Sequence, residues 1–362
     1  TLEDYDLVQN VNGTITLSGE SHSVTFYSTG GLPQFSSGDD DGAHDDDEDD
    51  DAPPSGNDDD VDDDGDDDDG HGSCDDGDEA GDPAPNPIGA SVILGTEQAD
   101  ALTGTADGET IMGLGGRDVV FAGSGNDNVM GGGGADMLYG DGGNDRILAG
   151  AGGDLVTGGA GNDTVFGQGG DDMIVAQADD GDDVYYGDGM SGGSGNDTLD
   201  MSAIGANITA DLGTGFMGRG SVSSAASGSD TIWGIENIVT GSGNDTITGS
   251  NAANVMDGGT GNDTFRFLSA AAADGDTIIG FQPGDKIDLS GMDANWCDAG
   301  NQSFTLVSGA FTGAKGELLV THETQDGESY TVVQGNISGG SDADFKFSIK
   351  GSHDLTASDF NL

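Results

Sequence analysis

The sequence predicts an all-β protein built mainly as a solenoid of short parallel strands, and three observations support this fold class. Aspartates recur every nine positions over seven consecutive units, from Asp118 to Asp172. The residue two positions after each of them is apolar. Six turn-forming residues, rich in glycine, alternate with three that suit a strand. A fixed short period of this kind is the signature of a repeat architecture, in which each unit packs on its neighbours.

The repeat has a fixed internal register, in which we call the carboxylate position six. Extending the register backwards adds two more units, so that nine consecutive units carry an acidic residue at this position: Asp100, Glu109, Asp118, Asp127, Asp136, Asp145, Asp154, Asp163 and Asp172. Position eight is always apolar: Leu102, Ile111, Val120, Val129, Leu138, Ile147, Val156, Val165 and Ile174. We expect position eight to point inward and to pack on the opposite strand.

A clean unit runs from Gly158 to Phe166 and reads GGAGNDTVF. Its glycines permit positive φ and a close approach of neighbouring backbones. Thr164, Val165 and Phe166 have the branched or aromatic side chains that fit a pleated surface. Three residues are too few for an independent strand, so the units must stack in parallel to form a sheet.

Stacking these units creates a row of like charges. Carboxylates on adjacent rungs would lie about 4.8 Å apart, where each neighbouring pair costs about 1 kcal/mol in water and about 3 kcal/mol near a protein surface. Arg117 and Arg146 are the basic residues within the nine units, so a free cation is required. Carboxylate and carbonyl oxygens on a flexible glycine turn suit calcium, which accepts six to eight oxygens, better than magnesium.

The units GLGGRDVVF, AGSGNDNVM, GGGGADMLY and GGAGNDTVF resemble the GGxGxDxUx repeats of the RTX, or hemolysin-type, proteins. The resemblance implies multiple calcium ions in a right-handed parallel β-roll with two nonapeptides per turn. One edge would then carry Asp118, Asp136, Asp154 and Asp172, and the other Asp127, Asp145 and Asp163. It also implies that turn carbonyls complete each site: those of Gly116, Gly125, Gly134, Gly143, Gly152 and Gly161. There are two alternatives to calcium sites. Glycine turns that fold without metal would leave the repulsion between carboxylates uncompensated. A glycine-rich phosphate-binding loop would need a basic residue and a following helix beside its glycines, and the repeats lack this combination.

The register breaks after Asp172. Residues 176–190 are acidic and irregular, so we expect the roll to pause there within an insertion near 176–235. GGSGNDTLD restores one unit at Asp197, and the register resumes at Glu236, Asp245, Asn254 and Asp263. Of these, Asp197, Asp245 and Asp263 are expected calcium ligands, whereas the uncharged Asn254 predicts a weaker or absent site.

From Thr264 onward the pattern becomes a series of alternating runs that predict antiparallel strands. With the preceding repeats they resemble the C-terminal region of serralysin-type secreted proteases, which implies a β-sandwich-like cap. The ending HDLTASDFNL is similar to the C-termini of type I secretion substrates, which implies export by that machinery. The expected organisation is a β-hairpin segment at 1–36, an acidic segment at 37–92, the roll at 93–264, and the cap with its secretion signal at 265–362.

The formal net charge is −61, which argues against nucleic acid and anionic membranes as partners. Residues 39–82 alone hold 25 acidic residues and no basic ones, a composition typical of disorder. Asp60 to Gly65 partly matches a D-x-D-x-D-G calcium loop, but His71 stands where the bidentate glutamate belongs. Whether calcium orders this segment is left open by the sequence.

Residues 1–36 contain two alternating runs, at 11–19 and 22–29, that predict a hairpin. No initiating Met, signal peptide or apolar run of membrane-spanning length occurs in the sequence, which suits either a mature fragment or a C-terminally addressed secreted protein. With the RTX resemblance, we expect a secreted, extracellular or cell-surface protein without membrane insertion. Cys74 and Cys297 lie in dissimilar segments, and a disulfide between them has no support in the sequence.

No catalytic motif is found. His322-Glu323 begins the only HE pair, and Asp326 stands where a zincin needs its second histidine, so the protease site of the serralysins is missing. We therefore expect a non-enzymatic, calcium-binding structural protein that self-associates into a filament, layer or matrix. The alternatives are a secretion and folding module of a larger exported protein, such as a protease, and an enzyme with an unrecognised site.

Overall fold

The computed structural model describes residues 91–189, 194–213, 218–295 and 297–362, and the backbone of four short strands before them. The chain divides into two compact units, Thr1–Gly89 and Ala90–Leu362. In the first unit β1 (Asp6–Asn10), β2 (Thr14–Ser18), β3 (Ser23–Tyr27) and β4 (Gln34–Ser36) form an antiparallel sheet in chain order. The acidic segment 39–82, with its partial calcium loop and Cys74, lies outside the described residues.

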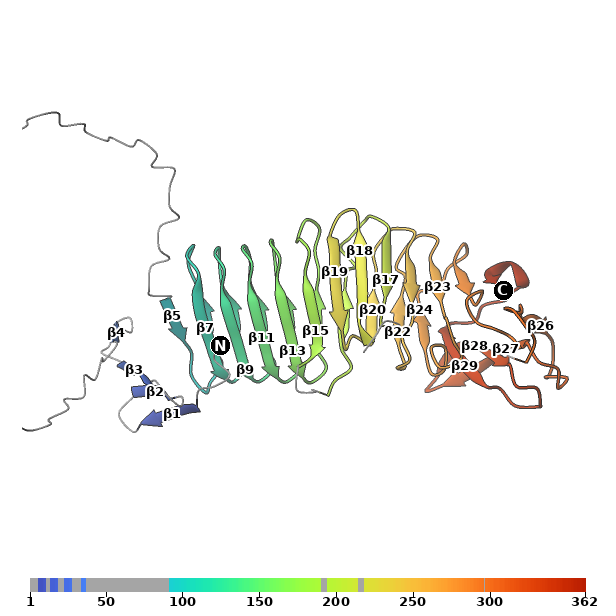
Figure 1. Ribbon diagram of the computed structural model, residues 1–362, viewed down its shortest axis with the longest axis horizontal. Coiled ribbons are helices and arrows are strands. Elements are labelled where there is room, and N and C mark those ends of the chain that lie inside the picture. The colour runs from blue at the N-terminus through green and yellow to red at the C-terminus, as the bar shows by residue number, and fades with distance from the viewer. Residues whose placement is uncertain are drawn as a thin grey trace, which may run out of the picture. The chain divides into compact units, whose positions relative to one another are not determined.

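The second unit is a solenoid of two facing sheets of 13 strands each, and the chain alternates between them (Figure 1). One sheet begins with β5 (Ser91–Leu94), β7 (Glu109–Gly115), β9 (Asn128–Gly133), β11 (Arg146–Ala151), β13 (Thr164–Gly169) and β15 (Val184–Asp188). The other begins with β6 (Ala101–Thr103), β8 (Val119–Phe121), β10 (Met137–Tyr139), β12 (Leu155–Thr157), β14 (Met173–Val175) and β16 (Thr198–Asp200). Neighbours in each sheet pair in parallel, as Ile147 does with Val129 and Val165, so one turn contains two nonapeptides.

The core of the solenoid is the position-eight column. Its residues from Ile111 to Ile174 are fully buried between the two sheets, which confirms their inward direction. Leu102, in the first rung of its sheet, packs against the core but is only partly buried. Each fully buried aliphatic side chain contributes about 1.5–3 kcal/mol. A single narrow column supplies this burial, so each rung depends on the rungs beside it.

The roll does not pause at 176–190, where an interruption was expected. β15 pairs in parallel with β13, and the spacing between Asp163 and the equivalent Asp183 is 20 residues. The two extra residues are absorbed in the turn. The actual insertion is β17 (Ile208–Asp211) and β18 (Gly220–Ser224), which form an antiparallel meander with β19 (Gly228–Trp233). It widens one sheet only, because in the other β16 pairs directly with β20 (Asn237–Val239).

The antiparallel cap expected for 265–362 is seen only in part. β21 (Thr246–Thr248), β22 (Val255–Asp257), β23 (Thr264–Arg266), β24 (Thr277–Ile279) and β25 (Lys286–Asp288) continue the parallel solenoid. The repeat persists there, since Asp276 and Asp285 are nine residues apart and each precedes a buried isoleucine by two. Only β27 (Glu317–Gln325), β28 (Glu328–Asn336) and β29 (Phe345–Lys350) are antiparallel.

The remaining strands close the carboxyl-terminal end. β26 (Thr305–Val307) pairs in parallel with β27, and β30 (Phe360–Asn361) pairs in parallel with β25 after a 3₁₀ turn at Ala357–Asp359. The terminal residues resembling a secretion signal are thus part of the solenoid sheet. No helix within the described residues is long and apolar enough to span a bilayer.

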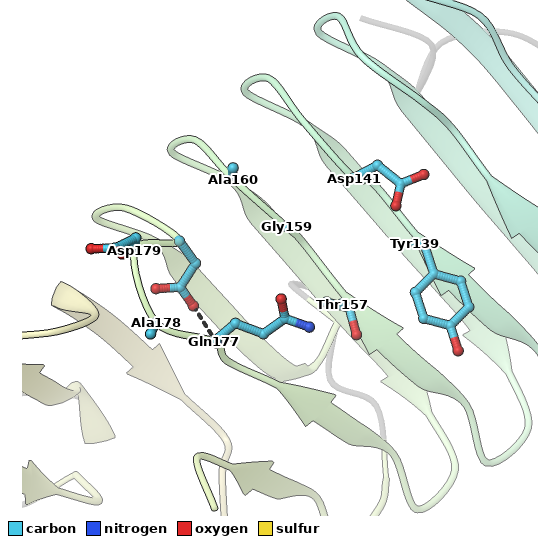
Figure 2. A pocket seen from close by; sticks show the side chains of 9 residues that line it. Tyr139, Asp141, Thr157, Gly159, Ala160, Gln177, Ala178 and Asp179 are labelled. Carbon is cyan, nitrogen blue, oxygen red and sulfur yellow. Dashed lines mark hydrogen bonds between the residues drawn. The ribbon is translucent and has the colours of Figure 1, made fainter. Parts of the chain in front are cut away.

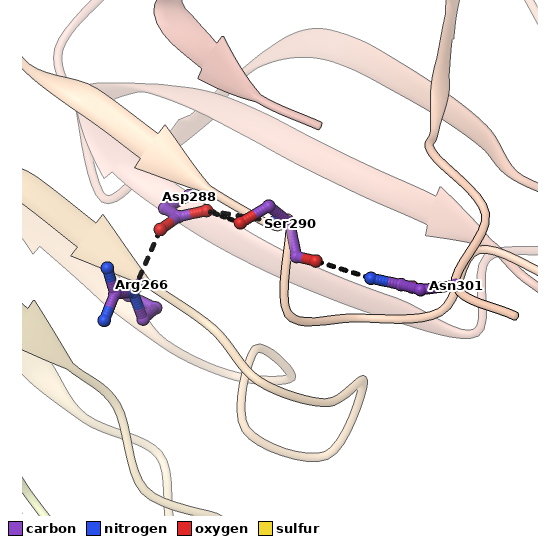
Figure 3. A network of polar contacts seen from close by, with 4 residues as sticks. All are labelled: Arg266, Asp288, Ser290 and Asn301. Atoms are coloured by element: carbon purple, nitrogen blue, oxygen red, sulfur yellow. Dashed lines mark hydrogen bonds and ion pairs between the residues drawn. The ribbon is translucent and has the colours of Figure 1, made fainter.

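At this end of the solenoid a basic side chain neutralises an aspartate (Figure 3). Arg266 on β23 lies opposite Asp288 on β25, with 2.9 Å between Nε and Oδ2. The Ser290 hydroxyl donates to Asp288 Oδ1 at 2.6 Å, and the Asn301 amide donates to the Ser290 carbonyl at 2.6 Å. Burial opposes ionisation, but the bonds from Ser290 and Arg266 outweigh it and lower the pKa of Asp288. The Arg266 guanidinium thus neutralises Asp288, whereas the ladder carboxylates need a cation from solution for the same purpose.

Two adjacent glycines offer a test of how closely the turns are stacked. A Cβ on Gly143, where φ is +131°, would lie 1.5 Å from the carbonyl oxygen of Gly125, whereas a Cβ on Gly142 would meet nothing within 4 Å. We expect Gly143→Ala to destabilise the calcium-loaded protein by about 1–3 kcal/mol or more, because it adds backbone strain to a steric clash. Gly142→Ala should change stability by less than about 0.5 kcal/mol. Thermal unfolding of both variants in saturating calcium checks the pair, and equal losses would contradict it.

Candidate metal sites

The position-six carboxylates form two ladders, one along each edge of the solenoid. Within a ladder each carboxylate accepts a hydrogen bond from the backbone N–H of the preceding member, as Asp145 Oδ1 does from Asp127 at 2.8 Å. The first ladder contains Asp100, Asp118, Asp136, Asp154, Asp172, Asp197 and Glu236. The second contains Glu109, Asp127, Asp145, Asp163, Asp183 and Asp230. After the insertion the same kind of bond joins Ile208, Asp245, Asp263 and Asp285 on one edge, and Asn254 and Asp276 on the other. This is the division between two edges that the RTX resemblance implied.

The second oxygen of most ladder carboxylates has no partner. Asp118, Asp127, Asp136, Asp145, Asp154, Asp163 and Asp172 are each at least 97% buried, yet each has a buried Oδ2 that accepts no hydrogen bond. Leaving one buried polar group unsatisfied costs about 1–3 kcal/mol, and more if it is charged. Seven such oxygens in consecutive turns point to a missing partner that is cationic.

Five of the seven unpartnered oxygens, those of Asp118, Asp136, Asp145, Asp163 and Asp172, border a space that a glycine at position one keeps open, whereas alanine stands at position one in the other two units. A Cβ on Gly113 would lie 2.3 Å from Asp118 Oδ2 and 2.5 Å from the carbonyl oxygen of Gly131 in the next turn. The same pair of oxygens, one carboxylate and one carbonyl from the following turn, recurs beside Gly131, Gly140 and Gly167. Oxygen donors converging from two turns fit a calcium ion held between rungs.

The position-four glycines that were predicted to supply carbonyl ligands lie in the turns as expected from their sequence. All six have positive φ: Gly116, Gly125, Gly134, Gly143, Gly152 and Gly161. Their carbonyls face the position-four glycine of the next turn, as Gly116 faces Gly134. The position-one carbonyls, which lie beside the unpartnered carboxylate oxygens, were not foreseen. They could have been identified from the small residue, glycine or alanine, that begins each of these units.

Side chains alone supply too few ligands for a metal ion at these candidate sites. Among the residues that the structure describes, no group of three or more histidines, cysteines or acidic residues is placed to hold one metal ion. One or two carboxylates per site is too few for the six to eight oxygens of calcium. A calcium ion between the turns would therefore need backbone carbonyls as further ligands, and glycine in the turns leaves room for them.

The ladders extend beyond the ligands that the sequence singled out. Asp197, Asp245 and Asp263 are buried ladder members, as their predicted role requires, although their metal contacts stay a prediction. Asp183, Asp230, Asp276 and Asp285 also accept ladder bonds and were missed. The nine-residue spacing of Asp276 and Asp285 could have revealed both. Asp183 differs from its neighbours, because the buried Tyr185 hydroxyl donates to its Oδ2 at 2.6 Å.

Asn254 stands at a ladder position, but hydrogen bonds within the protein satisfy its side chain. Its Oδ1 accepts from the Ser250 N–H at 2.7 Å, and its Nδ2 donates to the Glu236 carbonyl at 2.8 Å and to the Ser250 hydroxyl at 3.0 Å. Its side-chain amide is therefore satisfied at both ends. This arrangement agrees with the weaker or absent site predicted for this unit.

Burial raises the pKa values of the ladder carboxylates when no cation is present. Desolvation raises the pKa of Asp145 and Asp172 to about 7 and that of Asp154 and Asp163 to about 6. Ladder bonds oppose this shift and neighbouring carboxylates add to it. Protons and calcium therefore compete for the same oxygens.

This competition predicts opposite pH dependences with and without calcium. Because the folded pKa values lie above the ordinary value of 3.8, the calcium-free roll is most stable at low pH and loses that stability as pH rises through 6–7. Calcium affinity should instead fall as pH drops through the same range. The folded fraction by circular dichroism at pH 5, 6.5 and 8 in calcium-free buffer, with calcium titrations at each pH, checks both signs. A calcium-free protein that gains stability towards pH 8 would contradict the prediction.

One hollow on the described part of the chain lacks the groups of a nucleophile and base pair. A small hollow beside the turns is lined by Tyr139, Asp141, Thr157, Gln177 and neighbouring turn residues, with Gln177 extending toward Thr157 (Figure 2). Its lining includes no histidine, cysteine, serine or lysine, so no nucleophile stands beside a nitrogen base.

The His322-Glu323 pair lies on strand β27, not on a helix. The strand ends at a tight hairpin in which Asp326 and Gly327 both have positive φ. His322 Nδ1 is 3.3 Å from the Thr331 hydroxyl on the paired strand. The spacing of a zincin helix is therefore absent at this pair. Cys297 is an exposed free cysteine.

Comparison with known proteins finds two family models that match parts of the solenoid unit. Residues 90–138 and 139–174 match the RTX calcium-binding nonapeptide repeat, and residues 189–362 match the C-terminal domain of the M10 peptidase serralysin. A subunit of the mannuronan C5-epimerase from Azotobacter vinelandii, known from its solution structure, is 18% identical, with 78% of this chain and 86% of that chain covered and a TM-score of 0.15. No curated protein matches the chain.

Proposed function

We propose that this chain, which carries RTX calcium-binding nonapeptide repeats and a serralysin C-terminal domain, is a secreted protein whose solenoid folds when calcium binds between its turns. The row of buried carboxylate oxygens without partners carries the proposal. RTX repeats bind calcium, and the many buried aspartates of the stack accommodate multiple ions. Calcium would neutralise the ladders and join each turn to the next.

The ligands we assign are the ladder carboxylates together with turn carbonyls. The carboxylates with an unpartnered oxygen, from Asp118 to Asp172, are the main set, and Asp197, Asp245 and Asp263 extend it. The position-four carbonyls from Gly116 to Gly161 and the position-one carbonyls beside the unpartnered oxygens would complete the shells. These residues supply oxygen ligands only, as calcium prefers.

Calcium dependence would couple folding to export. Inside a cell, where free calcium is scarce, the acidic chain would remain unfolded and competent for a type I secretion channel. Outside, millimolar calcium would close the roll. The serralysin-type C-terminal domain and the ending Asp359-Phe360-Asn361-Leu362 support this route and an extracellular or cell-surface location.

For the role outside the cell we propose calcium-dependent self-association. β5 and β6 are the terminal strands of their sheets, and an edge strand presents unpaired backbone groups to another chain. The acidic residues 39–82 would add ligands for calcium shared between chains. The alternative is a non-catalytic module that helps a larger exported protein to fold, which the serralysin C-terminal match favours.

Sedimentation velocity and electron microscopy of the full chain, with 5 mM calcium and with excess EGTA, separate these roles. Self-association predicts calcium-dependent species larger than the 36.1 kDa monomer. Only monomers in calcium would refute assembly and leave the folding module. A chain that binds no calcium by equilibrium dialysis would refute both.

A further inference from the structure

Two kinds of turn in the solenoid are distinguished by what contacts the ladder carboxylate; the turns of Asp230, Asp245 and Asp276 belong to neither, because their Oδ2 has no partner and position two lacks positive φ. In the seven turns from Asp118 to Asp172, which we call open turns, Oδ2 has no partner. In three others, which we call latched turns, the side chain at position six is satisfied from within its own turn. The latched turns are those of Asp100, Glu109 and Asn254.

The latch is the residue at position two. Asp100 Oδ2 accepts the Thr96 N–H at 2.6 Å and the Thr96 hydroxyl at 2.8 Å. Glu109 accepts the Thr105 N–H at 2.9 Å and its hydroxyl at 2.5 Å. Ser250 supplies both groups to Asn254 in the same way, at 2.7 and 3.2 Å. One residue thus donates two hydrogen bonds to the atoms that face a cation in the open turns.

Backbone conformation separates the two kinds as sharply as the hydrogen bonds do. Position two has positive φ in all seven open turns: Leu114, Gly123, Gly132, Asp141, Gly150, Gly159 and Gln168. The non-glycine residues with positive φ in the described part of the chain do not include Thr96, Thr105 or Ser250. A β-branched residue strongly disfavours positive φ. Threonine therefore holds the turn in the conformation in which its N–H reaches the carboxylate.

The open conformation is costly without a ligand. Leucine and glutamine in the left-handed region cost about 1–2 kcal/mol each, and Leu114 and Gln168 adopt it with φ of 78° and 77°. The latched turns avoid this cost and also lack glycine at position four, where Gln98, Asp107 and Ala252 stand. Both differences are written in the sequence, so the kind of turn can be recognised from positions two and four.

We propose that the latched turns are calcium-independent, and that the calcium array begins at Asp118. This inference rests on the proposed function and refines it, because it removes Asp100 and Glu109 from the loaded set. Thr96 and Thr105 then close the first two turns of the solenoid without metal. Terminal units of repeat proteins are characteristically different from internal ones, since they must be stable with one neighbour.

Calcium bound per folded chain at saturation, measured by equilibrium dialysis with metal analysis, tests the proposal. Asp100→Asn should leave the number of ions unchanged, whereas Asp118→Asn should lower it by at least one. The double variant Thr96→Gly/Gln98→Gly turns residues 95–100 into GGEGAD, a complete repeat motif, and should bind one more ion. Thr96→Ser keeps both donors and is the matched control, with no change expected.

Each outcome is decisive. If Asp100→Asn loses an ion as Asp118→Asn does, the latch proposal is wrong while the proposed function stands. If the double variant is folded by circular dichroism and gains no ion, the assigned cause of the difference is wrong. If the double variant does not fold, Asp100→Asn alone decides. If the unaltered chain binds no calcium, the proposed function itself fails.

Discussion

Removing calcium from the full chain is expected to abolish its β-type circular dichroism over residues 100–263 at neutral pH. Without calcium, the open turns hold buried carboxylates that face one another along both ladders. At pH 7.5 these groups are largely ionised, because burial raises the pKa of Asp145 and Asp172 only to about 7. Charges buried without partners are among the most destabilising features that a fold can contain.

The size of the effect follows from linkage. At the affinities of extracellular modules, calcium at tenfold above Kd contributes about 1.4 kcal/mol per site. Seven open turns would together supply about 10 kcal/mol, which is comparable to the stability of a whole domain. The position-eight column does not stabilise the roll alone, because it buries one aliphatic residue per nonapeptide, at about 1.5–3 kcal/mol, while ordering the backbone costs about 1–2 kcal/mol for each of the nine residues.

The experiment is a far-ultraviolet spectrum of the full chain in 5 mM calcium, after excess EGTA, and after calcium is restored. Magnesium at the same concentration is the control for ionic strength and charge, and it should not restore the spectrum because it demands stricter octahedral geometry. A spectrum that persists in EGTA would show that the roll is held by its apolar column and hydrogen bonds alone.

The sequence was sufficient to predict the features of the fold that repeat every nine residues. Position eight predicts the core from Ile111 to Ile174, and position six predicts the two ladders, because a regular solenoid repeats one environment many times. It was insufficient where residues are inserted into turns. Two extra residues before Asp183 and four before Asp276 remove the nine-residue spacing without interrupting the stack. Turns tolerate such insertions cheaply, whereas the strand register does not.

The candidate sites were predictable in position but not in occupancy. Asp100 and Asp118 fit the same pattern, and only the structure shows that Thr96 satisfies the first while the second has an unpartnered oxygen. The residues that set this difference, at positions two and four, stand in the sequence, but the φ angle and the hydrogen bonds that result from them are seen only in the structure. The small size of the antiparallel cap was likewise hidden, since short parallel and antiparallel strands have similar residue patterns.

Asp145→Ala is expected to weaken calcium-dependent folding more than Asn254→Ala. Asp145 lies in the middle of the second ladder, where it accepts the Asp127 N–H and its own N–H donates to Asp163. Its loss removes a ligand oxygen and the ladder bond at 2.8 Å together. We expect a loss of about 1.4 kcal/mol for the site in addition to the ladder bond, and each 1.4 kcal/mol should raise the calcium concentration at half-folding about 1.5-fold, because about six remaining sites share the linkage.

Asn254→Ala tests a different kind of contact at an equivalent ladder position. It deletes bonds to Ser250 and to the Glu236 carbonyl, at a cost of about 1–3 kcal/mol. Because the Asn254 amide is satisfied without metal, the number of ions bound should not change, and the folding curve should shift while keeping its steepness. For Asp145→Ala the curve should both shift further and become less steep, since fewer ions are taken up on folding. Calcium titrations followed by circular dichroism measure both quantities, and an equal loss of steepness in the two variants would place a metal ion at Asn254 as well.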